Sequence, residues 1–238
     1  MMQLTDVVKN LLIINAIIYF GTFAFADVVR EWFTLYVPMT EQFKPVQLIT
    51  HMFMHGSPMH LFFNMFGLYM FGPPLEALWG PKKFLIFYLL AGFGAAAVHI
   101  GVSYFEYMQL TSAMSPDMVA EVLENGRALI ASGRNYSNEA LASLNLSLYA
   151  GVVGASGALY GILAAYGMKF PDAKLALIFL PVPIAAKYFI PGLLLLDLLG
   201  GFTGFSIFGQ NIAHFAHIGG AVAGALMVLF WRGGGGRF

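Results

Sequence analysis

Long apolar runs separated by shorter polar segments dominate the sequence. A helix needs roughly 20 apolar residues to cross a hydrocarbon core of about 30 Å, and six runs meet or approach that length. They lie at about 8–27, 59–79, 83–104, 153–169, 186–204 and 212–231. The pattern predicts an all-α, polytopic membrane protein in which residues 1–238 form one domain, a bundle of six transmembrane helices.

Two segments between these runs have a different pattern. Residues 28–58 are aromatic and half apolar, so we expect them to lie in the membrane interface. Residues 106–145 are the only markedly polar stretch and should project from the bilayer as an insertion. Within the insertion, Ser115 precedes a proline, which is typical of a helix N-cap followed by proline at the first helical position. We predict a helix from there to about Ala131.

Composition supports a lipid environment and excludes several classes of function. Hydrophobic residues make up 59% of the chain and charged residues only 10%, whereas soluble domains carry about 25% charged residues. The net charge is +0 and there is no basic run, so nucleic acid is not an expected partner. Cysteine is absent, which excludes disulfides, thiolate metal sites and a cysteine nucleophile.

The distribution of basic residues favours an orientation with both termini in the cytoplasm. In that orientation the inner side holds Lys9, Lys82, Lys83, Lys169, Lys174, Lys187, Arg232 and Arg237. The outer side then holds Arg30, Lys44, Arg127 and Arg134. Inner loops of membrane proteins are enriched in lysine and arginine, so the polar insertion should be outside. The compact chain, without an evident targeting extension, suggests a multi-pass protein of a bacterial inner (cell) membrane.

Polar side chains inside membrane spans are costly, and such residues are functional candidates by default. Here they are Asn15, His60, Asn64, His99, Ser156, Asp197, His214 and His217. Counted from the predicted inner ends of their helices, Asn64, Ser156 and His217 are each 13–15 residues up. At about 1.5 Å per residue they share one level, roughly 20–22 Å above the inner boundary. His60 lies one turn further out, whereas Asp197 lies only about 15 Å up and is not expected to join the serine and histidine.

The surroundings of Ser156 suggest how it could react at that depth. Too few residues lie between Ser156 and Lys169 to cross the bilayer, so we predict that residues 146–154 dip inward as extended backbone and that a helix begins at Ser156. The free N–H groups and positive dipole at a helix start stabilise an oxyanion. His217 could accept the hydroxyl proton and return it to the leaving amine.

Small residues predict that the fourth and sixth helices approach closely. Two GxxxG motifs, which allow helix backbones to meet, are formed by Gly157 with Gly161 and by Gly220 with Gly224. Ser156 and His217 each lie at the outer end of such a face. We expect Tyr160, one turn below Ser156, to pack against the ring of His217.

These residues together resemble the rhomboid family of intramembrane serine proteases. The similarity runs from His51 to the C-terminus. It rests on the segment 51–64 (HMFMHGSPMHLFFN), on Gly154-Ala155-Ser156-Gly157, on Ala216-His217-Ile218-Gly219-Gly220, on Glu76 and on a proline-bearing hairpin at 171–188. The resemblance implies six helices and cleavage of transmembrane protein substrates near their outer ends. It assigns Ser156 and His217 to a catalytic dyad without an aspartate.

The resemblance also implies roles for further residues. His60, Asn64 and the Ser156 N–H would form the oxyanion hole, and Gly154, Gly157 and Tyr160 would support the site. No cofactor or metal is implied. Where the family usually carries a Trp-Arg pair in its first loop this chain has Val46-Gln47, so the anchor of that loop is missing or replaced. Asp197 could either form a buried hydrogen bond or take part in gating.

Three other functions stay open at this stage. A transporter could use the intramembrane histidines and Asp197 as an ion path, although the polar groups gather at one level. A metalloenzyme could use His60, His99, His214 and His217, although no HExxH pattern is present. An inactive relative could bind transmembrane helices without cutting them. The sequence leaves the physiological substrate and the oligomeric state undetermined.

Overall fold

A computed structural model describes residues 4–177, 180–203 and 213–233, of which 176, 177, 180–182, 232 and 233 are described through their backbone alone. Residue 204 of the predicted fifth span, residue 212 of the sixth, and both extremes of the predicted domain 1–238 lie outside the described residues. The helices are α1 (Asp6–Ala24), α2 (Ala26–Phe33), α3 (Gln47–Thr50), a 3₁₀ turn (His51–Phe53), α4 (Pro58–Trp79), α5 (Pro81–Ser112), α6 (Pro116–Ala131), α7 (Glu139–Tyr149), α8 (Ser156–Lys169), α9 (Ala186–Thr203) and α10 (His214–Gly233). The strands are β1 (Lys174–Leu177) and β2 (Leu180–Ala185).

The fold is helical, as predicted, apart from one small hairpin. Each of the six apolar runs contains one main helix: α1, α4, α5, α8, α9 or α10. Among the described residues, α1, α5, α9 and α10 are long and apolar enough to cross a membrane. The 14 residues of α8 rise only about 21 Å, and α4 carries two internal prolines and several polar side chains. Composition and length therefore identify four candidate spans among the described residues, and the count of six stays a prediction.

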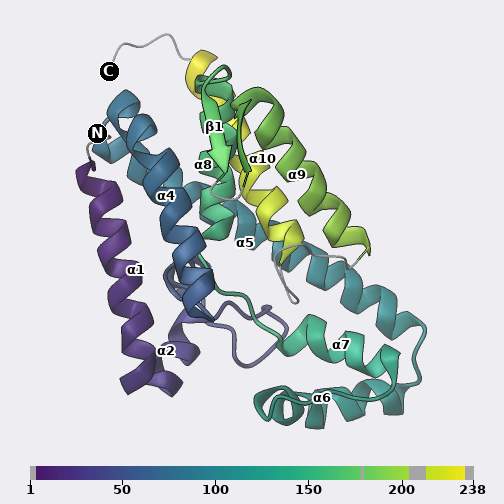
Figure 1. Ribbon diagram of the computed structural model, residues 1–238. Helices are drawn as coiled ribbons and strands as arrows, with labels where there is room; N and C mark the ends of the chain where they lie inside the picture. Colours follow the sequence, from purple (N-terminus) through teal and green to yellow (C-terminus); the bar gives the residue numbers. More distant parts are fainter. Residues whose placement is uncertain (1–3, 178–179, 204–212, 234–238) are drawn as a thin grey trace.

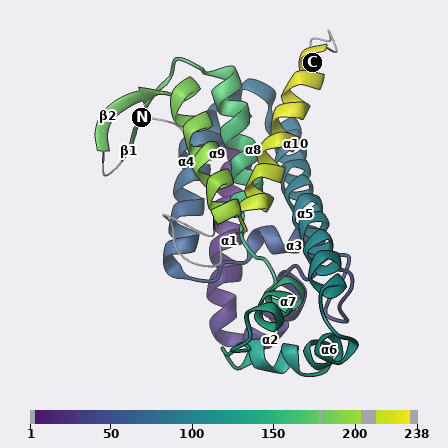
Figure 2. The same ribbon diagram turned by 90° about the vertical axis from the view of Figure 1, so that its right-hand side faces the viewer.

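Helix α8 lies at the centre of the bundle. It packs against α4, α5, α9 and α10, and its nine consecutive residues 157–165 are all buried. A helix that is apolar on every face is stable only when it is surrounded in this way. Helix α1 packs on the outer side of α4 (Figure 1). Helix α1 begins and α10 ends at one end of the bundle, and α6 and α7 lie at the other (Figures 1 and 2).

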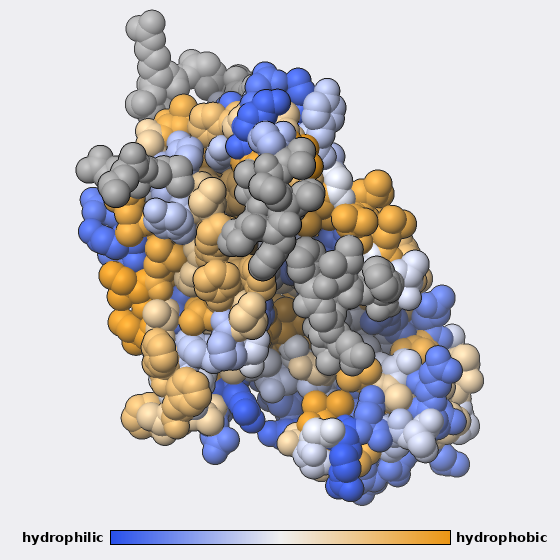
Figure 3. Space-filling view, viewed as in Figure 1, coloured by the Kyte–Doolittle hydropathy of each residue, from blue (hydrophilic) through white to orange (hydrophobic). Residues whose placement is uncertain are grey.

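The outer faces of the long helices are strongly apolar. Large side chains such as Phe23, Phe202 and Phe230 are about three-quarters exposed. Figure 3 shows apolar surface over α1 and α4, whereas hydrophilic surface gathers over α6 and α7. Contiguous apolar surface of this extent marks a face that contacts lipid or protein.

The polar insertion is built from two capped helices. Ser115 Oγ accepts a hydrogen bond from the Met118 N–H at 3.4 Å, and α6 ends at Ala131, which confirms the predicted helix. Asn138 Oδ1 accepts from the Leu141 N–H at 3.1 Å and caps α7. The prediction that residues 146–154 are extended was wrong for 146–149, which form the last turn of α7. Leu144 and Leu148 are buried on one face of that helix, so packing stabilises it.

The predicted hairpin at 171–188 is confirmed. Strands β1 and β2 pair antiparallel, with Lys174 opposite Ala185 and Leu175 opposite Ile184. At the base of the hairpin, Lys187 Nζ lies 2.7 Å from the carboxylate of Asp172. This ion pair is exposed, so its contribution to stability is small.

Two buried polar side chains hold the first third of the chain in place. The Gln47 amide accepts from the N–H groups of Tyr36 and Lys44 and donates to the carbonyls of Glu31 and Gln42. Gln47 therefore anchors the first loop through main-chain groups. The Glu76 carboxylate, 4% exposed, accepts from the N–H groups of Val7 and Val8 at 2.9 Å and from the Thr5 hydroxyl. It thereby satisfies free donors at the start of α1.

Candidate active site

Ser156 is the first residue of α8, as predicted, and follows a short non-helical segment. Val152 in this segment forms an isolated antiparallel bridge with Leu35, with both N–H···O distances at 2.9 Å. The Gly154 N–H donates to the His51 carbonyl at 2.9 Å. The main chain just before the serine is therefore fixed by the first loop, and the serine N–H lies at the start of a helix, where the first N–H groups have no partner within the helix.

Gly154 is required by both conformation and space. Its φ of +127° favours glycine. A Cβ at this position would lie 2.7 Å from His60 Nε2, too close for any real contact, and 3.6 Å from Ser156 Oγ. The glycine thus lets the His60 ring approach the segment that carries the serine.

His217, on the first turn of α10, lies beside Ser156. Its Nε2 is 2.8 Å from Ser156 Oγ, although 61 residues separate the two in sequence. The ring of Tyr160 stacks on the imidazole with centroids 4.2 Å apart and planes inclined by 15°, as predicted. The imidazole is therefore held both at one ring edge and across one face.

The close approach of α8 and α10 is confirmed in detail. A Cβ on Gly220 would lie 1.9 Å from the Gly157 carbonyl oxygen, and one on Gly224 would lie 2.6 Å from the Gly161 Cα. Backbone meets backbone along this face, so the two helices cannot accept a side chain between them. This contact sets the distance between Ser156 and His217.

The depth argument that separated Asp197 from the serine and histidine was wrong. Asp197 Oδ2 lies 2.8 Å from His217 Nδ1, and Oδ1 lies 2.7 Å from His214 Nδ1. The predicted difference in height, about 5–7 Å, is no longer than the reach of an aspartate and a histidine side chain toward each other. Counting from Lys187 also assumed that α9 begins at the level where α8 ends, whereas the β1–β2 hairpin intervenes.

His60 and Asn64 occupy consecutive turns on one face of α4. His60 borders the serine segment through its contact with Gly154, and its ring packs edge-on against His55 with centroids 4.9 Å apart. Asn64, 5% exposed, donates from Nδ2 to the main-chain carbonyl of His60 at 2.8 Å. Its direct partner is thus its own helix, and the second hydrogen of the amide is left for another acceptor.

His51 has a structural role in the first loop. Burial lowers the pKa of His51 to about 4. The hydrogen bond to the Gln47 carbonyl raises this pKa in part, and the nearby His99 lowers it further. The ring is therefore neutral at pH 7, and its Nδ1 lies 2.8 Å from that carbonyl as the donor. The His51 carbonyl receives the Gly154 N–H, so this residue connects the first loop to the serine segment.

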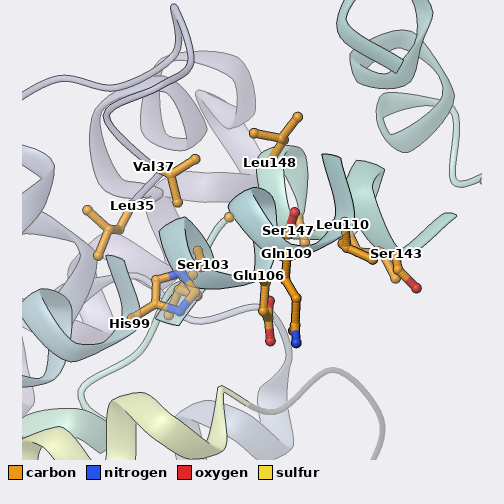
Figure 4. A pocket seen from close by; sticks show the side chains of 14 residues that line it. Leu35, Val37, His99, Ser103, Glu106, Gln109, Leu110, Ser143, Ser147 and Leu148 are labelled. Atoms are coloured by element: carbon orange, nitrogen blue, oxygen red, sulfur yellow. The ribbon is translucent and has the colours of Figure 1, made fainter. Parts of the chain in front are cut away.

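A separate cavity of about 420 Å³ lies between α5, α7 and the segments 35–37 and 150–152. Figure 4 shows that His99 and Ser103 lie together at one end and that Glu106 and Gln109 continue along α5. Ser156 and His217 do not line this cavity. It is a separate cavity with a mixed polar and apolar lining, and it does not extend the site.

The metal alternative lacks a matching cluster in the part of the chain that the structure describes. No group of three or more histidine or acidic side chains there is arranged to hold a metal ion. His99 lines the separate cavity, whereas His214 and His217 do not.

Sequence reasoning missed the contact between Asp197 and the two histidines of α10. The spacing of His214 and His217 by three residues puts both rings on one face of the helix, since a turn takes 3.6 residues. Apart from Asp27 and Glu76, which lie at the ends of their predicted spans, Asp197 is the one acidic residue inside the predicted spans. That combination was the available signal.

Comparison with known proteins agrees with these features. A family model described as the Rhomboid domain matches residues 42–233. Presenilin-associated rhomboid-like protein A, mitochondrial, of Danio rerio is 27% identical over 191 residues, 78% of this chain and 38% of the relative. Its Homo sapiens counterpart is 28% identical over 179 residues, 75% of this chain and 36% of the relative. Rhomboid protease AarA of Providencia stuartii is 26% identical over 185 residues, 74% of this chain and 52% of the relative. The chain thus spans about half the length, or less, of these curated relatives.

Proposed function

Because the chain belongs to the rhomboid family, whose domain its residues 42–233 match, we propose that it is an intramembrane serine endopeptidase with Ser156 as nucleophile and His217 as base. The observation that carries the proposal is the 2.8 Å contact between Ser156 Oγ and His217 Nε2 at the start of a buried helix. A nucleophile within hydrogen-bond reach of a base is the geometry that covalent catalysis requires.

The chemistry follows from that geometry. His217 accepts the hydroxyl proton while Ser156 Oγ attacks the scissile carbonyl, and the resulting tetrahedral intermediate carries an oxyanion. His217 then gives the proton to the leaving amine, which breaks the C–N bond and leaves an acyl-enzyme. Water, activated by the same imidazole, hydrolyses the ester and restores the serine.

The oxyanion is stabilised in this proposal by three kinds of donor. The Ser156 N–H is free at the helix start, where the dipole of α8 adds positive potential. His60 borders the same space, and the second amide hydrogen of Asn64 is available from the turn below. Three further residues act indirectly. Gly154 lets His60 approach, Gly157 lets α10 approach, and Tyr160 orients the ring of His217.

We propose further that residues 1–238 form a single six-span domain, with α4 and α8 crossing the membrane beside the four more apolar helices. Short α8 then begins below the outer surface, and the dyad opens outward. A chain with α1 beginning and α10 ending at one end of the bundle fits the predicted orientation with both termini in the cytoplasm of a bacterial cell. The substrates in this proposal are transmembrane proteins, cut near their outer ends.

The test is a cleavage assay with the purified chain in phosphatidylethanolamine–phosphatidylglycerol vesicles and a model single-span protein. We expect a cut near the outer end of the substrate helix, located by mass spectrometry. A fluorophosphonate probe should modify Ser156 and block cleavage, and a chelator should have no effect. Cleavage abolished by the chelator would support the metal alternative, and the absence of both cleavage and labelling would identify an inactive member of the family.

The two α4 donors are expected to contribute to the rate rather than to substrate binding. Asn64→Ala and His60→Ala should each lower kcat by about 10²-fold with little change in KM, because the oxyanion exists only in the transition state. Steady-state kinetics on the model substrate measures both constants. Ser112→Ala, at the far end of α5, serves as the control. A change confined to KM would show that these side chains bind substrate instead.

A further inference from the structure

We propose that Asp197 is a positioning residue for His217, an inference that rests on the proposed function. Asp197 lies on α9, whereas Ser156 and His217 lie on α8 and α10, so the carboxylate connects the reactive pair to a third helix. Its side chain is only 4% exposed, and each oxygen has an imidazole partner: Oδ2 faces His217 at 2.8 Å and Oδ1 faces His214 at 2.7 Å.

Burial makes these two hydrogen bonds important for the stability of the carboxylate. A carboxylate taken out of water is stable only when its oxygens accept hydrogen bonds from good donors. The N–H groups of His214 and His217 supply those bonds, one to each oxygen. Because His214 holds Oδ1, the carboxylate cannot rotate freely, and Oδ2 stays directed at His217.

The contact selects the tautomer of His217. A carboxylate oxygen at Nδ1 accepts only if Nδ1 carries the proton, which leaves Nε2 with a lone pair facing Ser156 Oγ. This is the tautomer that a general base needs. When Nε2 takes the serine proton, the negative carboxylate also stabilises the imidazolium that forms. Stacking on Tyr160 fixes the plane of the same ring.

The charged and titratable groups around His217 come from four helices. Helix α9 contributes Asp197, α10 contributes His214, and α8 contributes Tyr160. His60 on α4 lies beside Gly154, two residues before Ser156. Of these, only Asp197 combines a negative charge with a direct contact to the ring edge opposite Ser156.

The first arm of the test is kinetic. Asp197→Asn and Asp197→Leu should lower kcat by about 10²-fold or more with KM nearly unchanged; the corresponding change in soluble Ser–His–Asp triads costs about 10⁴-fold. The active-site concentration is measured by fluorophosphonate titration, so that loss of folded protein does not enter kcat. Asp172→Asn, which removes the exposed partner of Lys187, is the matched control and should leave kcat unchanged.

The second arm observes the ring directly. In ¹⁵N-histidine-labelled protein, solid-state NMR should show His217 protonated at Nδ1, with its signal identified by its loss in His217→Gln. In Asp197→Leu we expect the proton to move to Nε2. Unchanged kcat together with an unchanged tautomer would overturn the proposal.

The two proposals fail in distinguishable ways. If the wild type neither cleaves nor reacts with the probe, the proposed protease function fails, while the NMR spectrum still decides whether Asp197 sets the tautomer. If the wild type cleaves and Asp197→Asn cleaves equally fast per titrated site, the protease stands and the positioning role is refuted. A lower thermal midpoint with unchanged kcat would likewise refute it, because it would reveal a structural carboxylate.

Discussion

Replacing Ser156 with alanine is expected to abolish cleavage of a model transmembrane substrate, with kcat falling by about 10⁴–10⁶-fold. The hydroxyl oxygen forms the bond to the scissile carbonyl, and no neighbouring group can take its place at 2.8 Å from His217 Nε2. The kcat of His217→Ala should be almost as low, because the hydroxyl is a weak nucleophile without a base. The double variant should be no slower than Ser156→Ala, since the two residues act as a unit.

Quantitative gel densitometry over long incubations gives these rates, with fluorophosphonate labelling as an independent readout. Ser147→Ala is the matched control, because Ser147 lines the separate cavity and its hydroxyl donates to the carbonyl of Leu144 in its own helix. It should cleave at the wild-type rate. Activity that persisted in Ser156→Ala would refute the serine mechanism.

Adding a single methyl group at Gly220 is expected to have the second largest effect. A Cβ there would lie 1.9 Å from the Gly157 carbonyl oxygen, and backbone cannot move aside as a side chain can. The helices must separate, which costs about 1–3 kcal/mol of stability or more. The same separation lengthens the contact between Ser156 and His217, and a displacement of about 1 Å can cost about 10²-fold in rate.

The matched control for Gly220→Ala is Gly101→Ala, where nothing lies within 4 Å of the added Cβ. Alanine is favoured over glycine inside a helix by about 1 kcal/mol, so this variant should be as stable as the wild type or more so. Thermal unfolding in detergent and kcat per titrated site separate the two effects. If the two variants had the same thermal midpoint and the same kcat, the contact between α8 and α10 would be able to accommodate a methyl group, and the prediction would be refuted.

The local features of the site were predictable because they depend on short stretches of sequence. The segment from Ser156 to Lys169 is too short to cross the bilayer, and glycines at 154 and 157 lie close to the serine. This pattern indicated a helix that begins at Ser156. Paired GxxxG motifs indicated the contact of α8 with α10. The Ser115-Pro116 pair gave the start of α6, because capping is decided by neighbouring residues.

Features that depend on the relative height of helices were not predictable in the same way. The contact of Asp197 with His217 depends on where α9 begins after the hairpin, and hydropathy gives such boundaries only to within a few residues. The last turn of α7 escaped prediction for a different reason. Its residues are helical because Leu144 and Leu148 pack inward, and the four-residue spacing of these two leucines was the available signal.

Glu76 forms hydrogen bonds to a part of the chain that lies outside the region matched by the family model. The matched region begins at residue 42, whereas Glu76 inside it holds the first N–H groups of α1, at residues 7 and 8. A protein trimmed to the matched region would keep this 4%-exposed charge and lose the donors that satisfy it. We therefore expect stable folding to need helix α1, which the family match omits, and a minimal version of this protein to begin before Thr5.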